Sequence, residues 1–66
     1  MKIKTDYEHS KSFTAGKEYE VMYYKESYNI RYATIIDNLG HAALAFIGEP
    51  CPSLDNSGTW EIVEEK

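Results

Sequence analysis

The sequence is poor in residues that supply covalent cross-links or long apolar segments. Its 66 residues include one cysteine and two prolines. The single cysteine, Cys51, allows no internal disulfide, so packing alone must hold the fold, as is usual in a reducing compartment. The longest apolar run, residues 42–47, is far shorter than the roughly 18 residues of a membrane-spanning helix. Residues 2–6 are too charged for a signal peptide, and we expect a cytoplasmic protein without a membrane partner.

Residues that catalysis and metal binding require are equally scarce. Cys51 lies between two prolines, and no spacing brings it near His9 or His41 as a nucleophile would need. One cysteine and two separated histidines do not make a zinc site, and four isolated glycines form no phosphate-binding loop. Acidic residues at alternate positions, such as Glu18 and Glu20, are typical of a solvated strand edge. We expect no enzyme, no catalytic residue, no metal site and no cofactor.

Tyrosine is the residue that stands out among those present. The chain is 42% hydrophobic and 27% charged with a net charge of −4, and six of its nine aromatic residues are tyrosines. These values are ordinary for a folded globular chain and unlike those of a disordered one. A chain of this length forms one domain with a thin core, so we expect a single domain over residues 1–66 with its core in residues 13–63.

Alternating residues predict a strand over residues 18–24. Tyr19 and Tyr23 fall on the same face of that strand, which is the pattern of a half-buried strand. We expect these two tyrosines to fill the core and Tyr24 to be exposed on the opposite face. Residues 25–30 are expected to form a polar connection.

The clearest local signal is a hairpin over residues 32–46. Gly40 is placed for the left-handed position of a type I turn followed by a G1 bulge, which pairs Asp37 with His41. One face of the hairpin then carries Tyr32, Thr34, Ile36, Ala42, Leu44 and Phe46, and the other carries Ala33, Ile35, Ala43 and Ala45. We expect the face with the larger residues to be the core, and the alanine face to be thinly covered or open.

The rest of the chain predicts a loop and a last strand. Two prolines and a cluster of turn residues indicate a loop over residues 48–58. Trp60 and Ile62 point the same way in a strand over residues 59–63, which an acidic end follows. Too few strands are available for a two-sheet sandwich, so the predicted fold is all-β, a small, partly open SH3-like β-barrel of about five short strands.

Three motifs resemble a known group of proteins. They are Phe13-x-x-Gly16-Lys17-x-Tyr19-x-Val21, Ile35-Ile36-Asp37-Asn38-Leu39-Gly40 and Trp60-Glu61-Ile62-Val63. Together they resemble the small SH3-like proteins encoded by bacteriophages and prophages, over roughly residues 13–63. The resemblance implies the barrel fold and a protein that binds and redirects a protein of the host cell. The opening motif and paired tryptophans of eukaryotic SH3 domains are absent, which argues against proline-rich ligands.

Exposed tyrosines are the best candidates for a binding surface, because tyrosine combines a large rigid area with a polar tip and is enriched at interfaces. We expect the mechanism to be steric, with the domain docking on a host protein and inhibiting or redirecting it. The expected contact residues come from the first predicted strand, the connection after it and the second loop: Tyr24, Tyr28, Arg31, Glu49, Asp55 and Asn56.

Other partners stay open at this point. The same tyrosines could stack the bases of single-stranded nucleic acid, although a net charge of −4 gives no basic footprint. The glutamates could imitate nucleic-acid phosphates on a host enzyme, as a special case of inhibition. An exposed strand edge also allows a homodimer.

Overall fold

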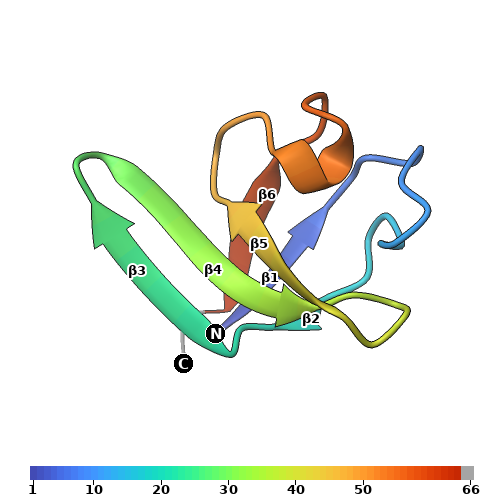
Figure 1. Cartoon of the computed structure of the whole chain (residues 1–66), viewed down its shortest axis with the longest axis horizontal. Helices are drawn as coiled ribbons and strands as arrows, with labels where there is room; N and C mark the ends of the chain where they lie inside the picture. Colours follow the sequence, from blue (N-terminus) through green and yellow to red (C-terminus); the bar gives the residue numbers. More distant parts are fainter. Residues whose placement is uncertain (65–66) are drawn as a thin grey trace.

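The computed structural model describes residues 1–64, and these form two antiparallel sheets of three strands each (Figure 1). The first sheet has the order β2–β1–β6, with β1 at Lys2–Thr5, β2 at Tyr19–Glu20 and β6 at Trp60–Glu64. The second has the order β3–β4–β5, with β3 at Tyr23–Ser27, β4 at Ile30–Ile36 and β5 at Ala42–Phe46. A 3-10 turn, η1, spans Pro52–Leu54. The predicted all-β class is confirmed, as two small sheets and not as a closed barrel. Glu65 and Lys66, part of the acidic end, lie outside the described residues.

Strand β1 is the element that the sequence did not predict. Its residues Ile3 and Thr5 are fully buried, and Ile3 pairs with Tyr19 of β2 on one side and Ile62 of β6 on the other. The hydroxyl of Thr5 donates a hydrogen bond of 2.7 Å to the carbonyl of Thr59, so this buried hydroxyl has a hydrogen-bond partner. The core therefore begins well before the predicted boundary at residue 13.

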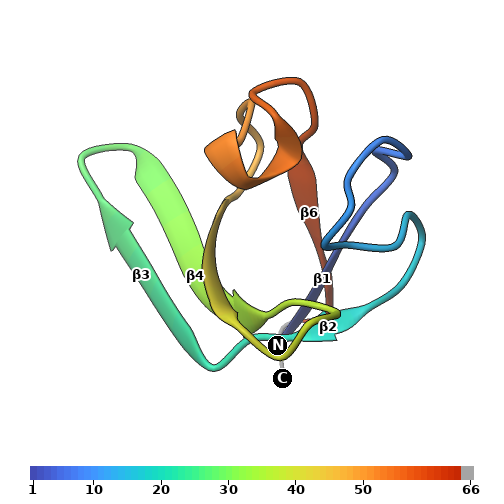
Figure 2. The ribbon, with the colours of Figure 1, turned by 45° about the vertical axis from the view of Figure 1, so that its right-hand side comes forward.

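The chain crosses from one sheet to the other at Val21 and Met22, inside the single strand that the sequence predicted. The N–H of Val21 donates to the carbonyl of Met1, 2.9 Å away, whereas the next N–H, that of Met22, donates to Thr34 in the second sheet, 2.8 Å away. Strands that change sheets at such an irregularity form the corners of small β structures. Figure 2 shows the consequence: β3 and β4 stand on one side, β1 and β6 on the other, joined at the base where β2 leads into β3.

The connection between β3 and β4 is much tighter than predicted. The expected polar segment over residues 25–30 is wrong, because pairing continues from Tyr23 to Ser27 and resumes at Ile30. Only Tyr28 and Asn29 turn, with φ angles of 48° and 70°. Two consecutive left-handed residues match the twist of a two-residue β-hairpin, and asparagine is among the residues that tolerate this conformation best.

The hairpin between β4 and β5 has the predicted turn and register. Asp37 N–H donates to the carbonyl of His41 over 2.9 Å, and Gly40 has a φ of +86°. The carboxylate of Asp37 also accepts hydrogen bonds from the N–H groups of Leu39 and His41, at 2.9 and 2.8 Å. The turn residues thus fix the register from Ile36–Ala42 to Tyr32–Phe46 as the sequence indicated.

The choice of core face in this hairpin was wrong. Ala33, Ile35 and Ala45 are fully buried, whereas Leu44 and Ile36 are exposed. The reason lies in the first sheet, which supplies the bulk of the core through Trp60 and other large side chains. Small side chains on the facing strands allow the two sheets to approach closely at native packing density, so the alanine face is the one that is covered.

Three aromatic rings fill the space between the sheets. Phe13, Tyr19 and Trp60 are all buried and meet edge to face, with ring centroids 5.0 to 5.7 Å apart. Such pairs add roughly 0.5–1.5 kcal/mol beyond the area that they bury. The predicted core position of Tyr19 is confirmed, and so is the shared direction of Trp60 and Ile62, since Trp60 is buried in the core and Ile62 packs against it.

One side chain at the tip of the β4–β5 hairpin ties down the long loop over residues 6–18. The Oδ1 atom of Asn38 accepts hydrogen bonds from the hydroxyl of Tyr19, at 2.8 Å, and the ammonium of Lys17, at 3.3 Å. Its Nδ2 donates to Thr14 Oγ1 over 2.9 Å, and its backbone N–H donates to the carbonyl of Ser12. The turn residue Asn38 therefore holds the loop that brings Phe13 into the core.

Candidate functional site

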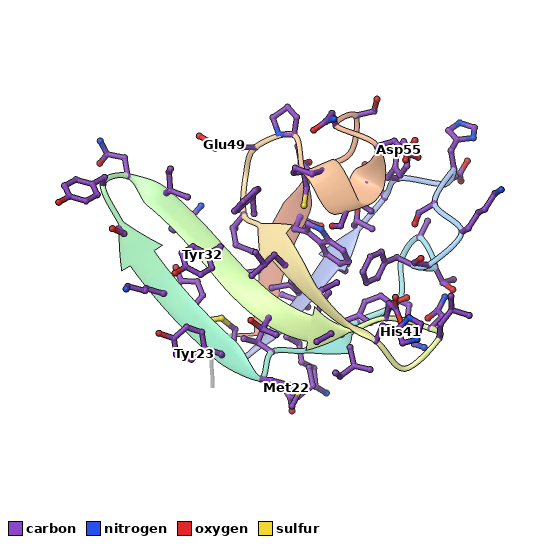
Figure 3. All side chains as sticks on the ribbon, viewed as in Figure 1. Met22, Tyr23, Tyr32, His41, Glu49 and Asp55 are labelled. Atoms are coloured by element: carbon purple, nitrogen blue, oxygen red, sulfur yellow. The ribbon has the colours of Figure 1, made fainter. Side chains whose placement is uncertain are left out.

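The side of the β3–β4–β5 sheet that faces away from the first sheet carries large apolar side chains. Several of them are exposed, whereas Tyr32 is half-buried and Phe46 packs partly against the core. We call this side the outer face; by strand register it consists of Tyr23, Lys25, Ser27, Ile30, Tyr32, Thr34, Ile36, Ala42, Leu44 and Phe46. The exposed fractions of Tyr23, Leu44 and Ile36 are 56%, 51% and 39%. Met22, at the bend that enters β3, is 67% exposed, and Figure 3 shows it next to Tyr23. Contiguous exposed apolar side chains of this kind mark interaction sites in folded proteins.

Cross-strand pairing arranges these side chains in rows across the sheet. Tyr23, Thr34 and Leu44 form one row, and Tyr32 pairs with Phe46 in the next. The rings of Tyr32 and Phe46 meet edge to face with centroids 6.4 Å apart. Cross-strand pairing fixes the backbone positions of these rows, so binding does not have to order the backbone of this face.

A shallow groove of about 400 Å³ continues the outer face at its β5 side. It is lined by Leu44 and Phe46 from β5 and by Pro52 and Ser53 from η1. Its walls are mainly apolar, as expected of a site that takes an apolar side chain with a few polar groups at the margin. The groove and the outer face together form one surface, which contains the exposed residues of β5.

The predicted contact residues Tyr24 and Arg31 lie on the opposite side of the β3–β4 hairpin. Tyr24 is half-buried and packs against the core, because the sheet change at Val21 and Met22 inverts the predicted alternation. Its hydroxyl donates to Glu26 Oε1 over 3.1 Å. Partial burial raises the pKa of Tyr24 above its usual 10.0, the hydrogen bond to the Glu26 carboxylate adds to this, and Arg31 opposes both. Tyr23, expected in the core, is the exposed member of the pair.

Tyr28 and Glu49 lie on two separate turns. Tyr28 is at the tip of the β3–β4 hairpin and 95% exposed, in agreement with its predicted exposure. Glu49 is exposed just after β5, and Figure 3 labels it near the loop that carries η1. Arg31 reaches this loop, since a Cβ added to Gly48 would be 3.5 Å from its Nη2. The structure thus places Arg31 beside Tyr24 and against the start of the second loop.

Asp55 and Asn56 belong to a different part of the surface. Both are exposed and have left-handed backbone angles, φ 58° and 57°, directly after η1. The Asp55 carboxylate accepts a hydrogen bond of 2.9 Å from the hydroxyl of Tyr7, which raises the pKa of Tyr7 above 10.0. The backbone of Gly58 packs against Tyr7 so closely that a Cβ added to Gly58 would be 2.6 Å from the Cβ of Tyr7. Asp55 therefore has a structural partner that anchors the η1 loop to the N-terminal loop.

The thiol of Cys51 has a packing role. It is fully buried, and its Sγ lies 3.0 Å from Ser53 Oγ, 3.5 Å from the N–H of Phe46 and 3.6 Å from the carbonyl of Leu44. Among residues 1–64 no three potential ligands gather as a metal site. Within the same part of the chain no helix is long and apolar enough to cross a membrane.

Sequence reasoning missed the outer face as a site because it assigned those residues to the core. The signal that distinguishes the two faces was present in the alanines: a strand face with small residues can lie under a second sheet, whereas large residues on both sheets would overfill the space. Ala33 and Ala45 carried this information.

In comparisons with known proteins, no family model, no curated protein and no solved structure matches the chain.

Proposed function

We propose that this protein is a small protein-binding module whose binding surface is the outer face of the β3–β4–β5 sheet. The observation that carries the proposal is the exposure of Tyr23, Leu44 and Ile36 on one face of the sheet, with Met22 also exposed at the bend that enters β3. Large apolar and aromatic side chains held in place are the typical anchors of protein interfaces. The partner is a protein, and the mechanism is steric: a domain that covers the partner's surface blocks or redirects it.

We further propose that the fold is a small SH3-like barrel of the phage type, acting on a protein in the host cytoplasm. Support comes from the three sequence motifs and from the strand that bends from one sheet into the other at Val21 and Met22. The turn η1 between β5 and the last strand closes one end of the two sheets in Figure 2. A host partner, and inhibition as the outcome, are expectations from the resemblance.

Nucleic acid is the competing partner, and the charge of the outer face argues against it. Of the outer-face residues, Lys25 alone carries a charge, whereas phosphate binding needs several cations. Tyr28 is exposed at the hairpin tip and could stack a base, but Lys25 and Arg31, the two cations of this hairpin, lie on its opposite faces. Salt dependence distinguishes the two partners, because phosphate contacts weaken log-linearly with salt concentration.

The test is capture of partners from bacterial lysate, with and without nuclease, using wild type and two variants. Leu44→Glu places a charge where the outer face meets the groove at β5, and Val63→Glu is the matched control on an exposed position of β6. We expect one or a few proteins to be captured by wild type and by Val63→Glu, to survive nuclease, and to be lost with Leu44→Glu. Capture that is unaffected by Leu44→Glu would overturn the assignment of this face.

A further inference from the structure

The edge of β3 is the longest open strand edge among the described residues. Within residues 1–64, β3 pairs with β4 on one side and has no strand on the other. It runs for five residues. Of the two edge strands of the first sheet, β2 has two residues, and β6, which also has five, is occupied at Trp60 by a bridge to Ile47 and a hydrogen bond from the N–H of Gly48. In Figures 1 and 2 the turn end of the β3–β4 hairpin extends beyond the rest of the molecule. A second chain could therefore approach the backbone of β3 without obstruction.

The other edge of the same sheet is blocked. On the free side of β5, the N–H of Phe46 and the carbonyl of Leu44 are both engaged by the Sγ of Cys51. Pro52 and Ser53 stand beside these two residues as the wall of the groove. Native proteins commonly cover an edge strand with a loop in this way to prevent unwanted pairing. The contrast leaves β3 as the edge at which this sheet can be extended.

The two-residue turn fixes which backbone groups of β3 point away from the sheet. In such a hairpin the flanking pair, Ser27 and Ile30, exchanges hydrogen bonds, and alternate pairs along the ladder do the same. The backbone N–H and C=O groups of Lys25 and Tyr23 therefore point toward β4. By the same alternation, the N–H and C=O groups of Tyr24 and Glu26 face outward. Their unpaired groups are spaced as an added β-strand requires.

Charge on this edge disfavours pairing with a second copy of the chain. In a twofold antiparallel pair, an axis at Lys25 sets two lysines opposite each other, and an axis at Glu26 sets two glutamates opposite each other; like charges in that position destabilise a sheet. In the third register the twofold axis passes through Tyr24, and Glu26 of each copy then lies opposite Met22 of the other copy. The Met22 N–H is already donated to Thr34, so this register loses a hydrogen bond.

We propose that an extended segment of a partner protein adds to β3 as a further strand, with an acidic residue opposite Lys25 and an apolar side chain over Tyr23. Lys25 is the one charge of the outer face, so a carboxylate beside it forms a favourable cross-strand pair. The apolar side chains of the segment then extend the outer face, while its backbone bonds to Tyr24 and Glu26, as in other cases of strand addition. This inference rests on the proposed function and specifies the chemistry of the partner at that surface.

The test uses random linear peptides displayed as a library and selected on the wild-type protein. We expect enriched peptides with alternating apolar residues and one acidic residue. Glu26→Pro removes an outward N–H that has no partner in the sheet and is tolerated at such a position, so it should weaken these peptides about tenfold or more. Glu26→Ala, the matched control, removes the same carboxylate and should change affinity by less than about threefold. Chemical synthesis of the chain with an N-methyl group at residue 26 gives the same answer should Glu26→Pro fold poorly.

Selection on Lys25→Glu sharpens the result, because the preferred charge in the peptides should change from acidic to basic. Equal binding to Glu26→Pro and Glu26→Ala would overturn strand addition, as would enrichment of proline-rich peptides or of none. If wild type sediments as a dimer and Glu26→Pro as a monomer, a second copy of the chain pairs at β3. That result would overturn the proposal that a different protein binds there. Peptides that are lost with Leu44→Glu but kept with Glu26→Pro would leave the outer face as the site and refute only the edge; peptides unaffected by both would refute the two proposals together.

Discussion

The two faces of the β3–β4–β5 sheet are made by the same strands and differ in what covers them. The inner face has Ala33, Ile35 and Ala45 under the aromatic cluster of the first sheet, while the outer face has Leu44 and Ile36 in contact with solvent. Two of the inner residues are alanines, whereas the exposed outer residues are large. Burial in this small fold follows from the size of the opposing side chains, because the large rings of Phe13, Tyr19 and Trp60 fill most of the space between the sheets and leave room for small residues opposite them. The residues left outside are then free to serve as a binding surface.

The largest expected difference between the two faces is the loss of unfolding free energy when alanine is replaced by leucine on each face of β5. Ala45→Leu inserts a large side chain between the sheets and should lower the free energy of unfolding by about 1–3 kcal/mol or more. Ala42→Leu, on the outer face of the same strand, should change it by no more than about 0.5 kcal/mol. Urea unfolding of both variants measures the difference. Equal losses would mean that the two faces are equally covered.

Asn38→Ala tests how the inner face is closed by the loop over residues 6–18. The variant removes the side-chain hydrogen bonds to Tyr19, Lys17 and Thr14, and we expect a loss of about 1–2 kcal/mol. Hydrogen exchange should accelerate in residues 10–17 more than in β4 and β5. Asn38→Asp keeps the oxygen that accepts from Tyr19 and should lose less. An unchanged loop in Asn38→Ala would show that the backbone hydrogen bond to Ser12 and the packing of Phe13 hold it without the Asn38 side chain.

On the outer face, Leu44→Thr should have little effect on stability. The side chain is half exposed and threonine is favoured on strands, so the expected change is within about 0.5 kcal/mol. Thermal unfolding checks this, with Ile35→Thr on the buried face as the control that should unfold much more readily. A large loss in Leu44→Thr would indicate that the outer face is covered in the folded chain.

The smallest expected effect is at the contact between Tyr7 and Asp55, which lies outside both faces. The hydrogen bond to the Asp55 carboxylate raises the pKa of the folded Tyr7 above 10.0. The folded state therefore keeps this proton at a pH where the unfolded chain has lost it, so the contribution is complete below about pH 10 and disappears as the pH rises through the raised pKa. Thermal midpoints in alkaline buffers should fall less with pH in Tyr7→Phe than in wild type. Parallel curves for the two proteins would exclude this contact as the cause.

Local rules in the sequence predicted the elements that depend on local chemistry. The hairpin at Asp37–Gly40 has the predicted register because a side-chain carboxylate and a left-handed glycine define the turn. The strand β1 was missed since its charged neighbours hide two buried residues, Ile3 and Thr5. The binding face was missed for a related reason: which face of a strand is buried depends on the other sheet, and the bend at Val21 and Met22 shifts the alternation there.

The most direct test of the outer face as a free surface is the unfolding free energy of Leu44→Glu and Ala45→Glu, neighbours on one strand. We expect Leu44→Glu to fold with nearly the stability of wild type, since its carboxylate remains in water. Ala45→Glu should fail to fold, because it buries an unpaired charge between the sheets. If Leu44→Glu were the variant that unfolds, the large-residue face would be core and the proposed binding surface would be contradicted.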